Sequence, residues 1–300
     1  MFNKLTVVAE LCQNHNGDIS ILKEMIHAAK ESGITHIKVQ DIKSSELSDR
    51  ERFNKKGTTS IFRPYQAEYN RLKSLDLPED FLEIFINECE KYGCTPIVTP
   101  FTFSSIKRIT DKKFKYIKVA SYDCSSFDFI EKLLKLKKPL IISTGATQEE
   151  EIIKTSKILK NLNFSFLHCV SIYPTPLEKC NLSKISFLKK FTDSVGWSDH
   201  TLFEKTNHVA SLVSILQGAK IIERHFTILP RDKTKDGPVS INEKNAKDLI
   251  DMSKLDHKDI EKILDDLMPD WKKCIGNGST DLSKEEMLNR DYYKGRFISK

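Results

Sequence analysis

Short apolar runs alternate with segments of helical period along most of the chain. The runs are rich in Val, Ile, Leu and Phe, and nearly every one is followed by an amphipathic stretch of about ten to seventeen residues. Eight such units in one uninterrupted series predict a closed (β/α)8 TIM barrel rather than an open, doubly wound sheet. The predicted strands are Leu5–Leu11, Thr35–Gln40, Pro96–Thr99, Tyr116–Ala120, Leu140–Ser143, Phe164–Cys169, Ser194–Ser198 and Lys220–His225.

Two of the predicted connections differ in character. Gly17–Asp18 predicts a turn and a cap before an amphipathic helix at Ile19–Lys30, and Gly33 ends that helix. Residues 41–78 are instead long, charged and rich in turn residues before a helix predicted at Pro78–Tyr92. Such a connection is typical of a functional loop or lid, so we expect it to help choose the substrate.

The last part of the chain departs from the repeating pattern. Helices are predicted near Asn242–Leu267, after which residues 275–300 contain three glycines and no clear strand pattern. We therefore expect a barrel over residues 1–270, followed by a short, linker-like C-terminal arm over residues 271–300.

Composition narrows the function classes. The net charge is +6, but its lysines are scattered instead of forming a basic stripe with interleaved aromatic residues, so we expect no nucleic-acid partner. A modest basic field favours an anionic small substrate. The seven cysteines form no CxxC pair, which argues against a disulfide framework and a zinc ribbon and favours the reducing cytoplasm. No apolar stretch reaches the length of a membrane span, so we expect no membrane association.

Polar side chains gather where the predicted strands end. In a TIM barrel these ends meet at one mouth, where active sites lie. Burying two Lys, two Glu and three His there without a ligand would cost several kcal/mol per unpaired charge, so an anionic ligand with a metal ion is the simpler interpretation. The strand-end residues are Glu10, Lys38, Gln40, Thr99, Lys118, Ser121, Ser143, Thr144, His168, Ser171, Ser198, His200, Glu223 and His225.

Two of these histidines are candidate metal ligands. His200 and His225 end the last two predicted strands, so both imidazoles can reach one divalent ion. Asp199 and Glu223 are candidate partners that orient them. His168 lies inside an apolar run, and we interpret it as a core residue.

Seven motifs, in order, resemble the sialic acid synthase family over about residues 5–240. Any one of them alone would be a weak signal, whereas the ordered series is specific. They are Ala9–Glu10 through Asn14–Asp18, Lys38–Gln40, Thr99–Phe101, Ser143–Gly145, Leu167–Cys169 with Tyr173–Pro176, Gly196–Thr201, and Glu223–Thr227.

The resemblance implies a metal-dependent transferase that condenses phosphoenolpyruvate with an aldehyde amino sugar to a nonulosonic acid, and it implies a homodimer. His200 and His225 would bind Mn2+ or Mg2+. The implied sugar-binding residues are Glu10, Gln40 and Tyr173, and the implied catalytic residues are Glu10, Lys118 and Asp123. The implied phosphoenolpyruvate-binding residues are Lys38, Thr99, Lys118, Ser121, Ser143, Ser171 and Ser198.

The chain also departs from the family pattern. Ser171 stands where the family commonly has Asn, Asp123 where it has Glu, and Val239 where Gly-Pro-Asp supplies a carboxylate for the sugar. The family's small C-terminal antifreeze-like domain is expected to be missing. Either a separate polypeptide supplies that part, or the acceptor is recognised without it.

Two other hypotheses remain open. A pyruvate aldolase acting through a Schiff base on Lys118 or Lys38 would need no metal. A non-catalytic barrel that binds an anionic sugar, or scaffolds glycan assembly, would bind ligand without releasing phosphate.

Overall fold

The computed structural model is a closed barrel of eight parallel strands whose spatial order follows the sequence. It describes residues 1–2, 4–50, 63–160 and 162–297. The TIM-barrel prediction is confirmed, and every predicted strand agrees with an observed one to within one residue at each end. The strands are β1 (Thr6–Glu10), β2 (His36–Asp41), β3 (Thr95–Pro100), β4 (Tyr116–Val119), β5 (Leu140–Ser143), β6 (Phe164–His168), β7 (Val195–Asp199) and β8 (Ile221–His225).

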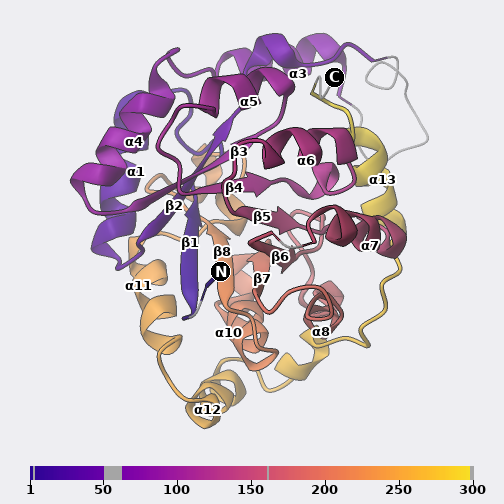
Figure 1. Cartoon of the computed structure of the whole chain (residues 1–300). Helices are drawn as coiled ribbons and strands as arrows, with labels where there is room; N and C mark the ends of the chain where they lie inside the picture. Colours follow the sequence, from indigo (N-terminus) through magenta and orange to yellow (C-terminus); the bar gives the residue numbers. More distant parts are fainter. Residues whose placement is uncertain (3, 51–62, 161, 298–300) are drawn as a thin grey trace.

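Helices surround the barrel (Figure 1). The predicted helix after β1 is confirmed: Asp18 caps it through a 2.7 Å hydrogen bond from the Ser20 backbone N–H, and it ends one residue beyond the expected Lys30. The α-helices are α1 (Ile19–Glu31), α3 (Tyr65–Lys73), α4 (Phe81–Lys91), α5 (Phe103–Ile109), α6 (Phe127–Leu134), α7 (Glu149–Ile158), α8 (Lys184–Leu188), α9 (Phe203–Thr206), α10 (Val209–Leu216), α11 (Glu243–Met252), α12 (His257–Leu267) and α13 (Lys284–Tyr293). Short 3-10 turns include η1 (Ser44–Glu46), η2 (Ser121–Asp123), η5 (Gly237–Val239) and η6 (Trp271–Cys274).

The barrel interior is layered because strand side chains alternate between its two faces. Phe2 and five inward strand residues form an apolar cluster that fills the lower part of the barrel. On β1, β3, β5 and β8, the inward residue two positions after the apolar cluster residue is polar. Glu10 follows Val8, for example, and Ser143 follows Ile141. The same strands therefore supply an apolar lower layer and a polar mouth.

The long connection after β2 is only partly described. It contains η1 and α3, while residues 51–62 of the expected lid lie outside the described residues. All seven cysteines, each within the described ranges, are buried free thiols. In the parts of the chain that the structure describes, no helix has the length and apolar character needed to cross a membrane.

The expected C-terminal arm contains η6 and α13, and it runs back along the barrel. Arg290 of α13 donates a 2.8 Å hydrogen bond to Glu151 of α7, and these two helices lie side by side (Figure 1). Residues beyond α13 then reach η1, where Leu47 and Phe297 form an antiparallel bridge and the Ser48 N–H donates to the Arg296 carbonyl. The arm thus crosses the end of the barrel at which the strands terminate.

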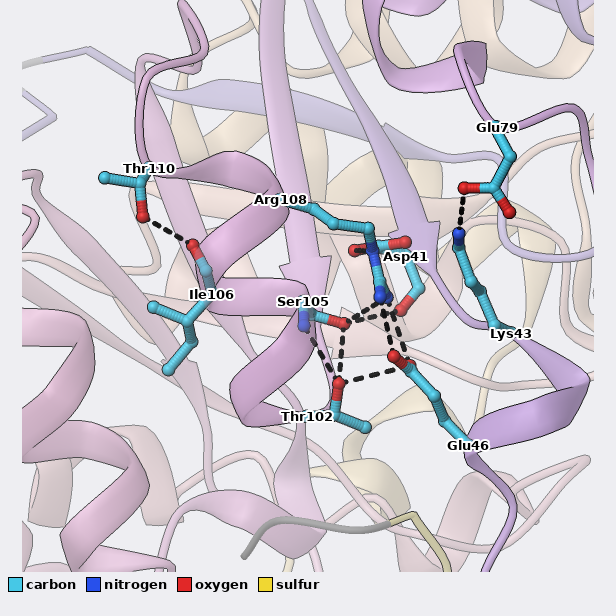
Figure 2. Close-up of polar contacts among 9 residues, drawn as sticks. All are labelled: Asp41, Lys43, Glu46, Glu79, Thr102, Ser105, Ile106, Arg108 and Thr110. Atoms are coloured by element: carbon cyan, nitrogen blue, oxygen red, sulfur yellow. Dashed lines mark hydrogen bonds and ion pairs between the residues drawn. The ribbon is translucent and has the colours of Figure 1, made fainter.

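A polar cluster fixes the turn that follows β2 (Figure 2). The Arg108 guanidinium donates to Asp41 at 2.9 Å and to Glu46 at 2.6 Å, and Thr102 donates to the same Glu46 carboxylate. Asp41 is fully buried. One arginine of α5 therefore ties the end of β2 to η1, next to the segment that the C-terminal arm contacts.

We predict that Arg108→Met lowers the free energy of unfolding by about 2–4 kcal/mol, because it leaves a buried carboxylate without its counter-charge. Urea denaturation measures the loss. Lys107→Met, at the exposed neighbouring position, is the matched control and should change stability by less than about 0.5 kcal/mol. Equal losses in the two variants would contradict the role given to the cluster.

Candidate active site

A cavity of about 370 Å³ opens at the C-terminal ends of the strands. It gathers residues from all eight strand ends or the loops that follow them, together with the C-terminal arm. All but one of the residues predicted to be catalytic, to bind substrate or to bind metal line it: Glu10, Lys38, Gln40, Thr99, Lys118, Ser121, Asp123, Ser143, Tyr173, Ser198, His200 and His225.

Ser171 is the predicted binding residue that does not line the cavity. It is 1% exposed, and its carbonyl accepts a 2.6 Å hydrogen bond from Asn289 of α13. Its hydroxyl lies beside Gly145, where a Cβ atom would come within 2.4 Å of the Ser171 Oγ. Ser171 therefore supports the packing of the C-terminal arm in this arrangement.

The cavity floor holds a buried ionic network. Lys38 pairs with the carboxylates of Glu10 and Glu223, the latter at 3.2 Å. Burial opposes charge on Glu223, but Lys118 and Lys38 outweigh it and lower the pKa of that carboxyl to about 2. Burial likewise opposes charge on Lys38, and its two carboxylates reverse the effect and raise its pKa. The floor is thus ionised and nearly compensated.

Lys118 is placed differently from Lys38. It donates a 2.6 Å hydrogen bond to Ser143 Oγ and lies 4.0 Å from Glu223. Because the lysine occupies an acceptor site on Ser143, the hydroxyl proton of that serine remains free to be donated. Burial lowers the pKa of Lys118. Lys118 and Ser143 together form a donor pair suited to an anionic oxygen.

The two predicted metal-binding histidines lie side by side. The ring centroids of His200 and His225 are 5.5 Å apart. His200 Nδ1 is 3.0 Å from the Val170 carbonyl, which fixes that nitrogen as the N–H donor and leaves Nε2 as an acceptor, 3.1 Å from Tyr173 Oη. Burial lowers the pKa of His200 to about 3, so the ring is neutral at physiological pH.

The residues fit a divalent ion. Neutral imidazole is a favoured ligand of such ions, and two rings this close can each place a nitrogen about 2 Å from one metal. His225 is 6% exposed, yet its Nδ1 has no hydrogen-bond partner among the described residues. A buried polar atom left in this way indicates a missing partner.

Glu223 and Asp199, the two carboxylates predicted to orient the histidines, are placed differently. Glu223 accepts a 2.9 Å hydrogen bond from Ser198 in the cavity wall. Asp199 instead points to the outer face of β7, where it pairs with Arg224 at 2.7 Å and accepts from Ser211. The prediction that Asp199 orients an imidazole is therefore wrong; its ion pair with Arg224 joins the ends of β7 and β8.

Asp123 lies on η2, at the side of the cavity. It is 8% exposed and accepts a 3.1 Å hydrogen bond from Ser126. Burial raises its pKa to about 6, against the opposing effects of Ser126 and Lys294. A carboxylate with a pKa in this range is well suited to accept a proton near neutral pH.

The cavity also contains residues that the sequence did not single out. Tyr293, Arg296 and Phe297 reach it from the C-terminal arm, and Asp236 reaches it from the loop after β8. Arg296 is 6% exposed and pairs with Glu68 at 3.4 Å. The arm mixes aromatic and basic residues, which is unusual for a linker. This feature of the sequence could have indicated that the arm contributes to the site.

Comparison with known proteins identifies the family of this chain. The NeuB family model matches residues 25–264. A pseudaminic acid synthase of Campylobacter jejuni is 31% identical over 99% of this chain and 82% of its own length. An N,N'-diacetyllegionaminic acid synthase of Legionella pneumophila is 28% identical over 98% of this chain and 83% of its own length.

A solved structure supports the fold. The N-acetylneuraminic acid synthetase of Leptospira borgpetersenii, in complex with citrate, superposes with a TM-score of 0.74, at 24% identity, over 97% of this chain and 91% of that one. The family match spans most of the residues that build the cavity. The chain therefore belongs to the NeuB family of synthases.

Proposed function

We propose that this protein condenses phosphoenolpyruvate with an open-chain acetamido hexose to give a nonulosonic acid and inorganic phosphate, in a reaction that depends on a divalent metal. One observation carries the proposal: a buried lysine and serine donor set and a pair of histidines line the same cavity. Membership of a family whose named relatives make pseudaminic and legionaminic acids supports the same chemistry.

Phosphoenolpyruvate would bind at the floor of the cavity. Lys118 and Ser143 offer an ammonium and a free hydroxyl proton 2.6 Å apart, and Lys38 adds a second buried cation. Charge-assisted hydrogen bonds of this kind hold phosphate and carboxylate oxygens strongly in a site from which water is excluded. Thr99 Oγ1 is buried without a hydrogen-bond partner among the described residues, which makes it a further donor.

The sugar would lie nearer the opening. Gln40 donates to Glu10 at 3.3 Å, so the amide and the carboxylate form one polar edge for hydroxyl groups. Tyr173 is 47% exposed at the opposite wall, with its hydroxyl beside His200. Asp236, three positions before the Val239 that replaces the family's aspartate, returns a carboxylate to the cavity.

The proposed reaction forms a C–C bond between the two substrates and a C–O bond from water to C2, and it breaks the C–O bond between C2 and phosphate. When held by His200 and His225, a divalent ion supplies a Lewis acid for the aldehyde oxygen. C3 of phosphoenolpyruvate attacks C1 of the aldehyde, while Lys38 and Lys118 hold the phosphate and carboxylate in line. Asp123 takes a proton from the water that adds to C2, which balances the proton taken up by the aldehyde oxygen as it becomes a hydroxyl. The C2–O bond to phosphate then breaks, the phosphate takes the proton of the C2 hydroxyl, and a 2-keto acid remains.

We further propose that the enzyme works in the cytoplasm with Mn2+ or Mg2+. The seven buried free thiols support a reducing compartment. Histidine and carboxylate donors suit Mn2+ better than Mg2+, which prefers oxygen ligands throughout.

We expect phosphate release from phosphoenolpyruvate that requires both an amino sugar and a metal. The panel should include N-acetylmannosamine, 2,4-diacetamido hexoses and simple aldoses, each with and without chelator. His225→Ala should lower the rate at least about a hundredfold, because one of the two histidine ligands is lost. His27→Ala, which removes an exposed imidazole far from the site, is the control and should leave the rate unchanged. Full activity of a folded His225→Ala protein would overturn the proposal.

The rate should also fall about tenfold per pH unit below about pH 6. A general base works only when deprotonated, and burial raises the pKa of Asp123 to about 6, so the active form is lost as the pH drops through that value. Asp123→Asn should remove this acid limb and lower the rate by about two to four orders of magnitude. Asp128→Asn, an exposed carboxylate on α6, should leave both unchanged. If Asp123→Asn kept the acid limb of the pH profile unchanged, a group other than Asp123 would be the general base.

A Schiff-base aldolase is the second candidate, because burial lowers the pKa of Lys118 and so favours the unprotonated amine that attacks a ketone. Borohydride with pyruvate separates the two functions. Trapping of Lys118 in the presence of chelator would favour the aldolase, whereas the proposed condensation predicts no trapped adduct.

A further inference from the structure

The end of β1 and the loop after β8 bring together three potential metal ligands, two of which the sequence did not single out. A sulfur of Cys12, a ring nitrogen of His225 and a carboxylate oxygen of Asp236 all lie within 4.8 Å of one another. Cys12 is 1% and His225 6% exposed, and Asp236 is partly buried. Three different donor types therefore share one small volume beside the cavity, which His225 and Asp236 line and Cys12 does not.

The fold holds this cluster firmly. The Cys12 backbone N–H donates a 2.7 Å hydrogen bond to Glu10, the residue that is in register with His225 across the β1–β8 pair. Asn14 donates from the same loop to the Phe226 carbonyl at 2.8 Å and to Ser240 at 3.0 Å, so it clamps both ends of the loop that carries Asp236. Cys12 lies more than two hundred residues from the other two donors in the chain, yet direct hydrogen bonds fix the segments that carry them.

Two further features point to a ligand. His225 Nδ1 is buried without a hydrogen-bond partner among the described residues. Cys12 has a positive φ of 42°, a conformation that costs an L-residue about 1 kcal/mol and that glycine adopts freely. A buried thiol kept at a position that suits glycine indicates a use for its sulfur.

We propose that Cys12 and Asp236 join His225 as ligands of the divalent ion, so that the site contains a thiolate. This rests on the proposed metal-dependent function and, within it, replaces Mn2+ or Mg2+ with a softer ion. Mg2+ prefers oxygen donors, whereas a thiolate beside imidazole and carboxylate suits Zn2+, Fe2+ or Co2+. The site therefore selects a transition metal of this softer group over Mg2+.

Cobalt titration of the full chain tests the thiolate directly. A Cys–Co2+ bond gives a charge-transfer absorption in the near ultraviolet that nitrogen and oxygen ligands do not give. We expect this band in the wild type and its loss in Cys12→Ser and Cys12→Gly. Cys12→Gly is the sharper variant, because glycine tolerates the positive φ and the barrel should fold at least as well. Thermal melts of each apo variant confirm folding.

Cys94→Ser is the matched control. Cys94 is a buried thiol just before β3, at the opposite end of the barrel, so its removal should leave the band intact. In competition titrations, Cys12→Gly should weaken Cd2+ binding about tenfold or more and Mn2+ binding distinctly less, since loss of a thiolate penalises the softer ion. Asp236→Asn should weaken both.

The alternative is that the Cys12 thiol only donates a hydrogen bond to Asp236. In that case the wild type would bind Co2+ without the charge-transfer band, or Cys12→Gly would retain it, and either result would overturn the inference. The titration needs no substrate, so its outcome is separate from that of the phosphate assay. A band without phosphate release would refute the proposed reaction and support the thiolate site. Phosphate release without a band would support the reaction and refute the thiolate site.

Discussion

The pairing of the first strand with the last is the constraint on which the site depends. Glu10 and His225 are 215 positions apart in the chain, yet closure of the barrel makes them register partners on β1 and β8. Each ladder hydrogen bond adds little by itself, but closure removes both sheet edges and fixes every strand end on one rim. The donors of the cavity are consequently held by the stiffest part of the molecule, and the loops need only complete the site.

Charge compensation explains why so many ionisable groups tolerate burial at that rim. Lys38 lies between Glu10 and Glu223, and Lys118 stands near Glu223, so no full charge on the floor lacks a counter-charge. Breaking one partner of such a network is costly, whereas the complete set is nearly neutral. A near-neutral floor can accept an anion and a cation together, which is the pairing that the proposed condensation requires.

The C-terminal arm links the fold to the proposed chemistry. Its helix α13 is fastened to α7 through Arg290 and Glu151, and the residues that follow place Arg296 and Phe297 in the cavity wall. Ser171, expected to touch substrate, instead lies under this arm. The strand ends therefore supply the donors of the cavity, and the arm supplies part of its wall.

The sequence by itself determined the barrel, the strand limits and about half of the cavity lining, because alternation of side chains along a strand is a local property and the end of each run marks the rim. Only the tertiary structure decided that Asp199 turns outward to Arg224, that Ser171 is covered and that the arm enters the cavity. It also brought Cys12 and Asp236 to His225. These placements depend on the path of loops and on partners hundreds of residues away, for which no local pattern of hydrophobic and polar residues carries a signal.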